Sequence, residues 1–301
     1  MSETKTVAFI GLGVLGGPMT GHLARAGFAV HAYNRSPEKA DYWRGKWAEQ
    51  ALDVILHLDP AATAQNADIV FICVGKDEDV EEVVRGSSGV FERMKDGAML
   101  VDHTTTSATL ARDLAEECEN RGFDWLDAPV SGGQAGAENG QLAIMCGGSV
   151  AAISRARPVM ESYAKAITHV GPAGAGQTAK MANQMCIAGI LGGLSEAVRL
   201  AQGAGLDLDK TYKAISGGAA QSWQMDNRWK TMTADKFDFG FAIDWMRKDL
   251  GYALDEARRL GLSSPITALV DQFYADVQAA GGSRYDTSGL ITRLSKSTKQ
   301  D

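Results

Sequence analysis

The sequence predicts an α/β protein in which a doubly wound, mostly parallel sheet is followed by an all-α domain, with a long helix linking the two. Strand-like and helix-like segments alternate through the first half, which is typical of right-handed βαβ units. A glycine fingerprint, Gly11-Leu12-Gly13-Val14-Leu15-Gly16, lies between the first strand-like run and the first helix-like run. After Gly176, helix-like segments follow one another with no further strand-like run.

The expected strands are short, continuously apolar runs. Parallel strands that are covered by helices on both faces lack the alternation of half-exposed strands. In chain order the expected strands are 6–10, 28–33, 68–74, 98–102, 123–128, 141–146 and 166–170. Between them, Ala- and Leu-bearing segments at 18–26 and 108–121 are predicted to be helices that cover the sheet.

The second half is predicted to be helical. From 177 to about 204 there is no proline, and Ala, Met, Leu and Ile recur at helical spacing. Three glycines interrupt this stretch, and since each costs a helix ~1 kcal/mol relative to alanine, they predict close packing against a neighbour. Further helices are expected at 207–215, 242–260 and 265–279. We therefore expect a nucleotide-binding domain at 1–170 and a helical domain at 171–301.

Composition argues against several classes of protein. The formal net charge is −7 and the pI is about 5.3, whereas a nucleic-acid footprint needs clustered Lys and Arg. No apolar run approaches the ~20 residues of a membrane span. The four cysteines are far apart, so we predict reduced thiols and no metal site. The N-terminus lacks the apolar core of a signal peptide, so a cytoplasmic location is expected.

The glycine fingerprint predicts a Rossmann-type dinucleotide site formed by residues 11–16. Gly11 permits a tight turn, Gly13 lets the backbone approach a pyrophosphate, and Gly16 allows close helix–strand packing. The following helix supplies N–H groups and a partial positive charge to the phosphates. A plain glycine turn is the alternative, but both flanks of this fingerprint fit a nucleotide site.

The end of the second strand predicts which dinucleotide binds. NAD sites usually carry Asp or Glu there for the ribose diol, whereas this chain has Asn34-Arg35-Ser36. No carboxylate repels a 2′-phosphate, and Arg35 can pair with one. NADP(H) is therefore expected to be preferred over NAD(H), unless Arg35 is only a surface residue. Val74, which ends the third strand-like run, is also expected at the cofactor.

Lys180 is the candidate general acid or base. It follows a glycine-rich stretch and precedes Asn183 by nearly one helical turn, so both side chains lie on the same helix face. Hydride transfer to a carbonyl builds negative charge on oxygen, and a positioned proton donor accelerates such a step ~10²–10⁴-fold. The alternative is an exposed helix lysine, because most lysines are surface residues.

Four sequence blocks, in this order, resemble the β-hydroxyacid dehydrogenases, a family that includes 3-hydroxyisobutyrate dehydrogenase and tartronate semialdehyde reductase. They are 9–19 with the fingerprint, 127–133 (Asp-Ala-Pro-Val-Ser-Gly-Gly), 174–184 around Lys180, and Lys248-Asp249-Leu250. Leu15 stands where methionine is usual. Asn183-Gln184 stands where many members have two asparagines, and it occurs in the tartronate semialdehyde reductase-like branch. Segment 43–59 is unlike most members.

The resemblance implies a role for each matched residue. It implies that Lys180 is catalytic with Asn183 beside it, that Ser131, Gly132, Gly133 and Gln184 bind substrate, and that Thr105 and Lys248 contact the cofactor. The physical chemistry agrees at the serine loop, because a hydroxyl and unobstructed backbone N–H groups can hold a carboxylate. A plain turn is the alternative there.

Together these features predict an NADP-dependent oxidoreductase that interconverts a short 3-hydroxy acid and its semialdehyde, with Lys180 as general acid or base. Imine reductases share the two-domain plan but usually replace this lysine. Decarboxylating 6-phosphogluconate dehydrogenase needs a longer helical domain. A non-catalytic NADP-binding protein on the same fold is the alternative outside enzymes. Partly by resemblance, a homodimer or homotetramer is expected.

Overall fold

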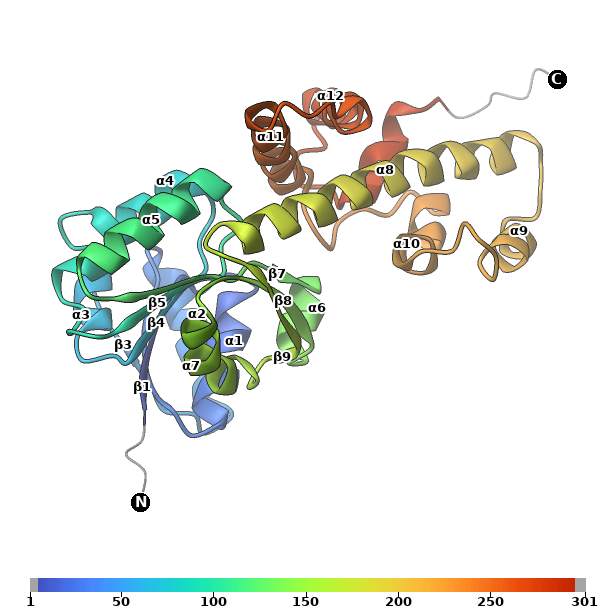
Figure 1. Cartoon of the computed structure of the whole chain (residues 1–301). Coiled ribbons are helices and arrows are strands. Elements are labelled where there is room, and N and C mark those ends of the chain that lie inside the picture. Colours follow the sequence, from blue (N-terminus) through green and yellow to red (C-terminus); the bar gives the residue numbers. More distant parts are fainter. Residues whose placement is uncertain (1–4, 296–301) are drawn as a thin grey trace. The chain divides into compact units, whose positions relative to one another are not determined.

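The first part of the chain forms a nine-stranded sheet in the computed structural model, which describes residues 5–295 (Figure 1). The strand order is β3-β2-β1-β4-β5-β6-β8-β7, and β9 pairs with β8. The strands are β1 (Thr6–Ile10), β2 (Ala29–Tyr33), β3 (Val54–Leu56), β4 (Ile69–Ile72), β5 (Met99–Asp102), β6 (Asp124–Asp127), β7 (Val130–Ser131), β8 (Leu142–Gly148) and β9 (Ala164–Gly171). Strands β1 to β6 are parallel, whereas β8 is antiparallel to β6 and β7.

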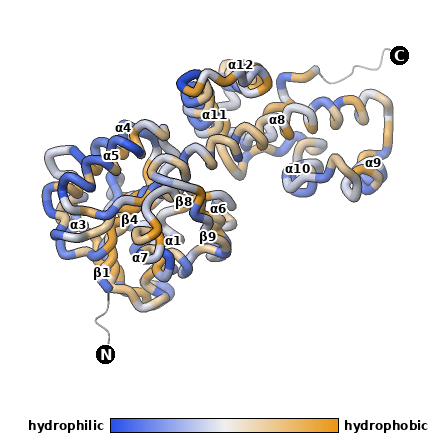
Figure 2. The backbone as a smooth tube through the Cα atoms, in the orientation of Figure 1, coloured by the Kyte–Doolittle hydropathy of each residue, from blue (hydrophilic) through white to orange (hydrophobic). Residues whose placement is uncertain are grey.

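Helices cover both faces of this sheet. They are α1 (Gly16–Arg25), α2 (Pro37–Ala48), α3 (Pro60–Ala64), α4 (Asp77–Arg85), α5 (Ala108–Asn120), α6 (Gly133–Glu138) and α7 (Val150–Met160), with a 3₁₀ turn at Val90–Glu92. Successive residues of a strand point to opposite faces, so in β1 Val7 and Phe9 enter the core under α1 and α7 while Ala8 and Ile10 enter the core under α4 and α5. Figure 2 shows the apolar central strands between more hydrophilic helices.

The second part is helical. It contains most of α8 (Ala175–Gly203), then α9 (Leu208–Ile215), α10 (Trp223–Thr233), α11 (Ile243–Arg259), α12 (Pro265–Ala279) and a 3₁₀ turn at Thr287–Arg293. Its own core gathers buried side chains around Trp229 and Tyr274. Internal contacts divide the chain into units at 1–180 and 181–301. Helix α8 therefore carries Lys180 at the end of one unit and Asn183 at the start of the other.

The predicted α/β fold with a helical domain and a long helix is confirmed. All seven expected strands are present, and Gly189, Gly192 and Gly193 all lie inside α8. The sequence patterns do not predict β3 and β7, which have only three and two residues. They also do not predict α2, which buries one residue, Trp47, and so has no apolar stripe. The expected domain boundary at 170/171 stays a prediction.

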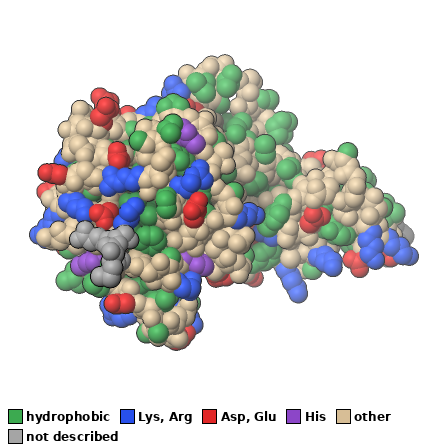
Figure 3. All heavy atoms as spheres, turned by 60° about the horizontal axis from the view of Figure 1, so that its bottom comes forward, with side chains coloured by type: hydrophobic (Ala, Val, Ile, Leu, Met, Phe, Trp, Pro, Cys, Tyr) green, Lys and Arg blue, Asp and Glu red, His purple; other side chains and the backbone are tan. Residues whose placement is uncertain are grey.

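The hydropathy of the helices, the charges on the surface and the positions of possible metal ligands indicate which partners the protein could bind. No helix within residues 5–295 is long and apolar enough to cross a membrane. On the face drawn in Figure 3, Lys and Arg side chains are interspersed with Asp and Glu. Within the same residues, no group of three or more His, Cys, Asp or Glu side chains could hold a metal ion.

Candidate active site

The glycine turn lies at the carboxyl end of β1, where the strand order reverses between β1 and β4. In doubly wound sheets, ligands bind outside the carboxyl ends of the strands at such a point. A side chain at Gly11 would overlap the Cys73 carbonyl, and one at Gly16 would overlap the Gly11 carbonyl, so packing requires both glycines. At Gly13 an added Cβ would meet nothing within 4 Å. The chain itself does not need glycine there, and this open backbone fits the close approach of a pyrophosphate.

The segment after β2 carries the expected 2′-phosphate contacts. Asn34 is used inside the protein, since its Oδ1 accepts from the Leu12 N–H (2.8 Å) and its Nδ2 donates to the Ser36 carbonyl (2.9 Å). The Arg35 side chain is 80% exposed, and its Nη1 lies 2.9 Å from Asp79 Oδ1. Ser36 Oγ donates to Glu38. The expectation that no carboxylate lies here is therefore wrong, because Asp79 and Glu38 approach residues 35 and 36 from α4 and α2. Exposed pairs of this kind contribute ~0–1 kcal/mol, so a phosphate can displace them.

The turn after β5 is held by side chains from three segments. The Val74 N–H donates to Thr104 Oγ1 (3.0 Å), which ties the end of β4 to this turn. Gln177, on α8, accepts from the Thr106 N–H and donates to the Thr104 carbonyl (2.7 Å). Thr105, the expected cofactor contact, is half-buried between these anchored neighbours. Val74 and Thr105 thus follow the neighbouring strands β4 and β5, and Val74 lies against Gly11. That either residue contacts the cofactor stays a prediction.

Asp127, at the end of β6, anchors the start of α8. Its Oδ1 accepts from the Gly174 N–H (2.8 Å) and its Oδ2 from the Gln177 N–H (2.9 Å), and the side chain is fully buried. A Cβ at Gly176 would come within 2.7 Å of the Asp127 carbonyl and carboxylate, which explains one glycine of the run. Burial raises the pKa of Asp127 to about 6, and the donated backbone N–H groups oppose that rise. Lys180 therefore stands on a helix whose first turn is fixed by a buried carboxylate.

Two further titratable groups lie at the end of β5. Burial raises the pKa of Asp102 to about 7, the nearby Asp127 and Asp77 charges add to the rise, and the Asp102 Oδ2 atom is buried without a hydrogen-bond partner. His103 has both ring nitrogens in use, one at the Ala128 carbonyl (2.7 Å) and one at the Tyr163 hydroxyl (2.9 Å). Burial lowers the pKa of His103 to about 4. This neutral ring is a structural group of the sheet unit.

The expected carboxylate loop is an open turn that only glycine can form easily. Strand β7 ends at Ser131, and Gly132 and Gly133 follow with φ of +133° and +62°. Residues other than glycine rarely adopt these backbone angles. Ser131 is half-buried and both glycines are exposed. Carboxylate binding by this loop stays a prediction.

The helical unit contains a chain of polar contacts that starts at Asn183. Asn183 Nδ2 donates to Gln184 Oε1 (2.9 Å), and Gln184 Nε2 donates to Asp249 Oδ2 (2.7 Å). Lys248 Nζ lies 3.2 Å from Asp249 Oδ1 and also lies over the rings of Trp245 and Tyr252. Gln184 and Asp249 are 2% and 1% exposed.

The Asp249 carboxylate determines which group donates and which accepts in each of these hydrogen bonds. An ionised carboxylate only accepts hydrogen bonds, so Gln184 must turn its NH₂ group toward Asp249 and its oxygen toward Asn183. Asn183 then keeps its own carbonyl oxygen as an acceptor. The Gln184 amide is thus engaged within the protein, and a direct contact between Gln184 and substrate stays a prediction.

Lys180, on the preceding turn of α8, is buried, with 8% of its surface exposed.

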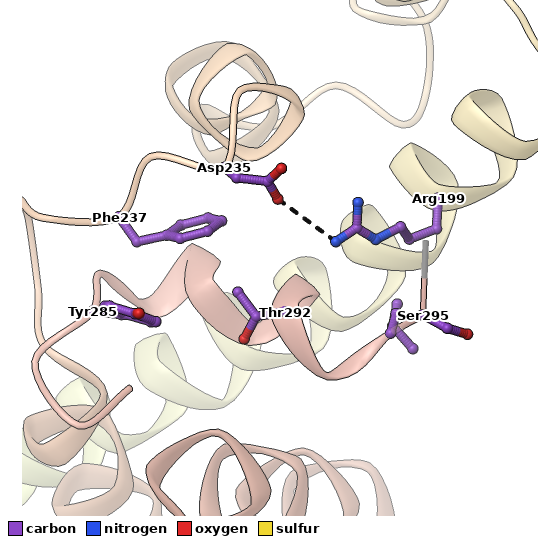
Figure 4. A pocket seen from close by; sticks show the side chains of 7 residues that line it. Arg199, Asp235, Phe237, Tyr285, Thr292 and Ser295 are labelled. Atoms are coloured by element: carbon purple, nitrogen blue, oxygen red, sulfur yellow. Dashed lines mark ion pairs between the residues drawn. The ribbon is translucent and has the colours of Figure 1, made fainter. Parts of the chain in front are cut away.

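A hollow elsewhere in the helical unit contains none of the predicted site residues (Figure 4). Its volume is about 420 Å³, and its lining includes Arg199, Asp235 and Phe237. The Arg199 guanidinium lies 3.7 Å from Asp235 and donates to Gln202 and to the Ile291 carbonyl. These existing contacts leave Arg199 poorly placed to hold an anion there.

Comparison with known families agrees with this geometry. Residues 6–171 match the NAD binding domain of 6-phosphogluconate dehydrogenase, and residues 174–294 match the NAD-binding family of NADP-dependent 3-hydroxyisobutyrate dehydrogenase. Fold and site thus define an NAD(P)-dependent oxidoreductase. More specifically, the chain belongs to the β-hydroxyacid dehydrogenase family and is an NAD(P)-dependent hydroxyacid dehydrogenase.

Individual relatives match over nearly their whole length. An uncharacterized oxidoreductase of Shewanella frigidimarina is 54% identical, with 97% of this chain and 98% of the relative covered. The 2-hydroxy-3-oxopropionate reductase of Escherichia coli is 37% identical, with 96% of each chain covered. The solved structure of Mycobacterium tuberculosis 3-hydroxyisobutyrate dehydrogenase with L-serine is 32% identical, with a TM-score of 0.87 and coverage of 97% of this chain and 99% of that chain.

Proposed function

We propose that this protein is an NADP(H)-preferring dehydrogenase that interconverts a short 3-hydroxy acid and its semialdehyde, with Lys180 as the general acid and base. The observation that carries the proposal is the placement of Lys180: it is buried, and it lies on the second turn of α8 just after the turn that Asp127 anchors. Short 3-hydroxy acids are favoured because the names of two relatives contain 2-hydroxy-3-oxopropionate and 3-hydroxyisobutyrate.

The proposed reaction assigns one task to each group of the chain. The cofactor, when bound at the glycine turn, accepts or supplies the hydride. Ser131, Gly132 and Gly133 hold the substrate carboxylate through a hydroxyl and backbone N–H groups. In oxidation, neutral Lys180 Nζ takes the proton of the substrate hydroxyl as a hydride leaves the carbon that bears this hydroxyl. In reduction, the Lys180 ammonium gives that proton to the oxygen that becomes negative.

Asn183 and the cofactor-side residues complete the assignment. With its NH₂ group committed to Gln184, Asn183 offers a carbonyl oxygen that can accept from the substrate hydroxyl or from an ammonium. The cofactor would be held by residues 11–16, by Asn34, Arg35 and Ser36, and by Val74, Thr105 and Lys248. The proposal includes a cytoplasmic location, a homodimer or homotetramer, and a functional boundary between 1–170 and 171–301.

A substrate panel tests this function. The purified protein is assayed with C3 and C4 3-hydroxy acids and NADP⁺ or NAD⁺, and with the matching semialdehydes and NADPH or NADH. We expect turnover of at least one short 3-hydroxy acid, and a higher kcat/KM with the phosphorylated cofactor. Cyclic imines with NADPH serve as the control panel, since an imine reductase would turn these over instead. Cofactor binding without turnover of any compound would indicate a non-catalytic protein.

Substitution of Arg35 tests the cofactor preference separately. In the variant Arg35→Ala, we expect the KM for NADPH to rise about 10-fold or more, because a charge-assisted contact to the 2′-phosphate contributes ~1.5–3 kcal/mol. The KM for NADH should change less than about twofold. The matched control is Arg44→Ala, whose guanidinium is also exposed and paired with a carboxylate, Asp41. Equal effects on NADPH and NADH would contradict the assignment.

A further inference from the structure

The segment that the sequence leaves without a role, 43–59, begins with a tryptophan that touches the glycine turn. Trp43, on α2, donates its indole N–H to the Leu12 carbonyl (3.0 Å). An added Cβ at Gly17, in the first turn of α1, would overlap the Trp43 ring. The ring therefore lies directly against the start of the helix that the dinucleotide turn opens.

Trp43 is one of a pair of tryptophans that fits a pair of glycines. Trp43 and Trp47 are four residues apart on α2, and Gly17 and Gly21 are four residues apart on α1, so each pair shares one helix face. A Cβ at Gly21 would lie 3.2 Å from Trp47 Nε1, and the two indole rings stack with centroids 6.2 Å apart. A Cβ at Gly17 would collide with the Trp43 ring, and one at Gly21 would be tight against Trp47, so the two indole rings fit the glycine face of α1.

The other backbone polar group of Leu12, its N–H, is held by Asn34. The Leu12 N–H donates to Asn34 Oδ1 (2.8 Å), while the Leu12 carbonyl accepts from Trp43. Both backbone polar groups of the buried residue Leu12, its N–H and its carbonyl, are therefore bound by side chains from residues 34–43. We propose that Trp43 is a positioning residue for the cofactor: by holding the carbonyl of the Leu12–Gly13 peptide, it keeps the adjoining Gly13–Gly16 backbone in its phosphate-binding form before the dinucleotide arrives.

This role predicts which measurement changes. A turn that is already ordered loses less conformational freedom when a ligand binds, so loosening it weakens cofactor binding without altering the chemical step. The turn approaches the pyrophosphate, which NADPH and NADH share, so both cofactors should be affected equally. The inference rests on dinucleotide binding at residues 11–16, and it is independent of the 2′-phosphate preference, which Arg35→Ala tests.

The decisive variant is Trp43→Phe, which keeps an aromatic ring and removes the N–H group. Its matched control is Trp47→Phe, because Trp47 Nε1 is buried without a hydrogen-bond partner, so this variant loses no hydrogen bond. Calorimetric titration should give dissociation constants for NADPH and NADH that are both raised about 3- to 10-fold in Trp43→Phe, the effect of losing one neutral hydrogen bond. In Trp47→Phe both constants should stay within about twofold of wild type. The kcat at saturating cofactor should stay within about twofold in both variants.

A second variant, Gly17→Ala, reaches the same contact from the other helix. The added methyl group displaces the Trp43 ring, so the dissociation constants for both cofactors should rise at least as far as in Trp43→Phe. Thermal melts by circular dichroism verify that each variant is folded at the assay temperature. Unchanged constants in Trp43→Phe overturn the proposal. An equal rise in Trp43→Phe and Trp47→Phe also overturns it, because general packing of α2 would then be the cause. A rise for NADPH alone would assign the effect to the 34–36 turn instead.

Discussion

Replacement of Lys180 by alanine is expected to lower kcat about 10²- to 10⁴-fold, the range that a positioned general acid or base contributes. The dissociation constant for NADPH should stay within about twofold of wild type, since the glycine turn and residues 34–36 are untouched. Single-turnover measurements with bound NADPH and an aldehyde substrate should show the same loss, which places it in the chemical step. Unchanged turnover would remove Lys180 from the reaction.

Two companion variants separate proton transfer from charge. Lys180→Arg keeps a cation but holds its proton too tightly to exchange it near neutral pH, so we expect a loss comparable to that in the alanine variant. Lys165→Ala removes an exposed lysine of the same unit and should leave kcat unchanged. In Lys180→Ala, added methylamine should restore part of the activity, because it can occupy the vacated space and exchange a proton. Activity in Lys180→Arg near the wild-type value would favour a purely electrostatic role.

Much of the fold can be predicted from local patterns of the sequence. Buried parallel strands such as β1 and β4 are unbroken apolar runs, and the alternation of their side chains between two cores requires helices on both faces. The glycine fingerprint is similarly local, because the turn, the close approach and the helix start all lie within six residues. Helix α8 is predictable because apolar residues recur at helical spacing over a long stretch without proline.

The parts that local patterns do not predict depend on contacts between distant residues. Trp43 forms a hydrogen bond with Leu12, 31 residues away in the sequence, and Asp127 forms one with Gly174, 47 residues away. No periodicity marks such pairs. The sequence of the 127–133 block predicts a role for its serine and glycines, whereas the structure shows that its first residue, Asp127, anchors the start of α8. Gln184 is a second case, because a polar residue beside Asn183 in sequence is directed toward Asp249 in space.

Asp127 shows how strongly the site depends on such distant contacts. In the variant Asp127→Ala, the Gly174 and Gln177 N–H groups lose their acceptor in a buried place. Because each of these two unsatisfied buried groups costs ~1–3 kcal/mol, we expect the free energy of unfolding to fall by about 2–6 kcal/mol in urea titrations. The start of α8 would also loosen, so kcat should fall at least about 10-fold even where the variant is fully folded.

Two aspartate variants on strand β6 make this prediction specific. Asp127→Asn keeps one oxygen to accept an N–H but points an NH₂ group at the other, so its stability should lie between those of wild type and Asp127→Ala. Asp124→Asn changes a carboxylate of the same strand that is 45% exposed and paired with Arg155, and it should cost less than about 1 kcal/mol. If Asp127→Ala unfolds as wild type does, α8 does not need this anchor. If it loses stability but keeps its kcat, the anchor serves the fold alone, and Lys180 must be positioned by the remainder of its helix.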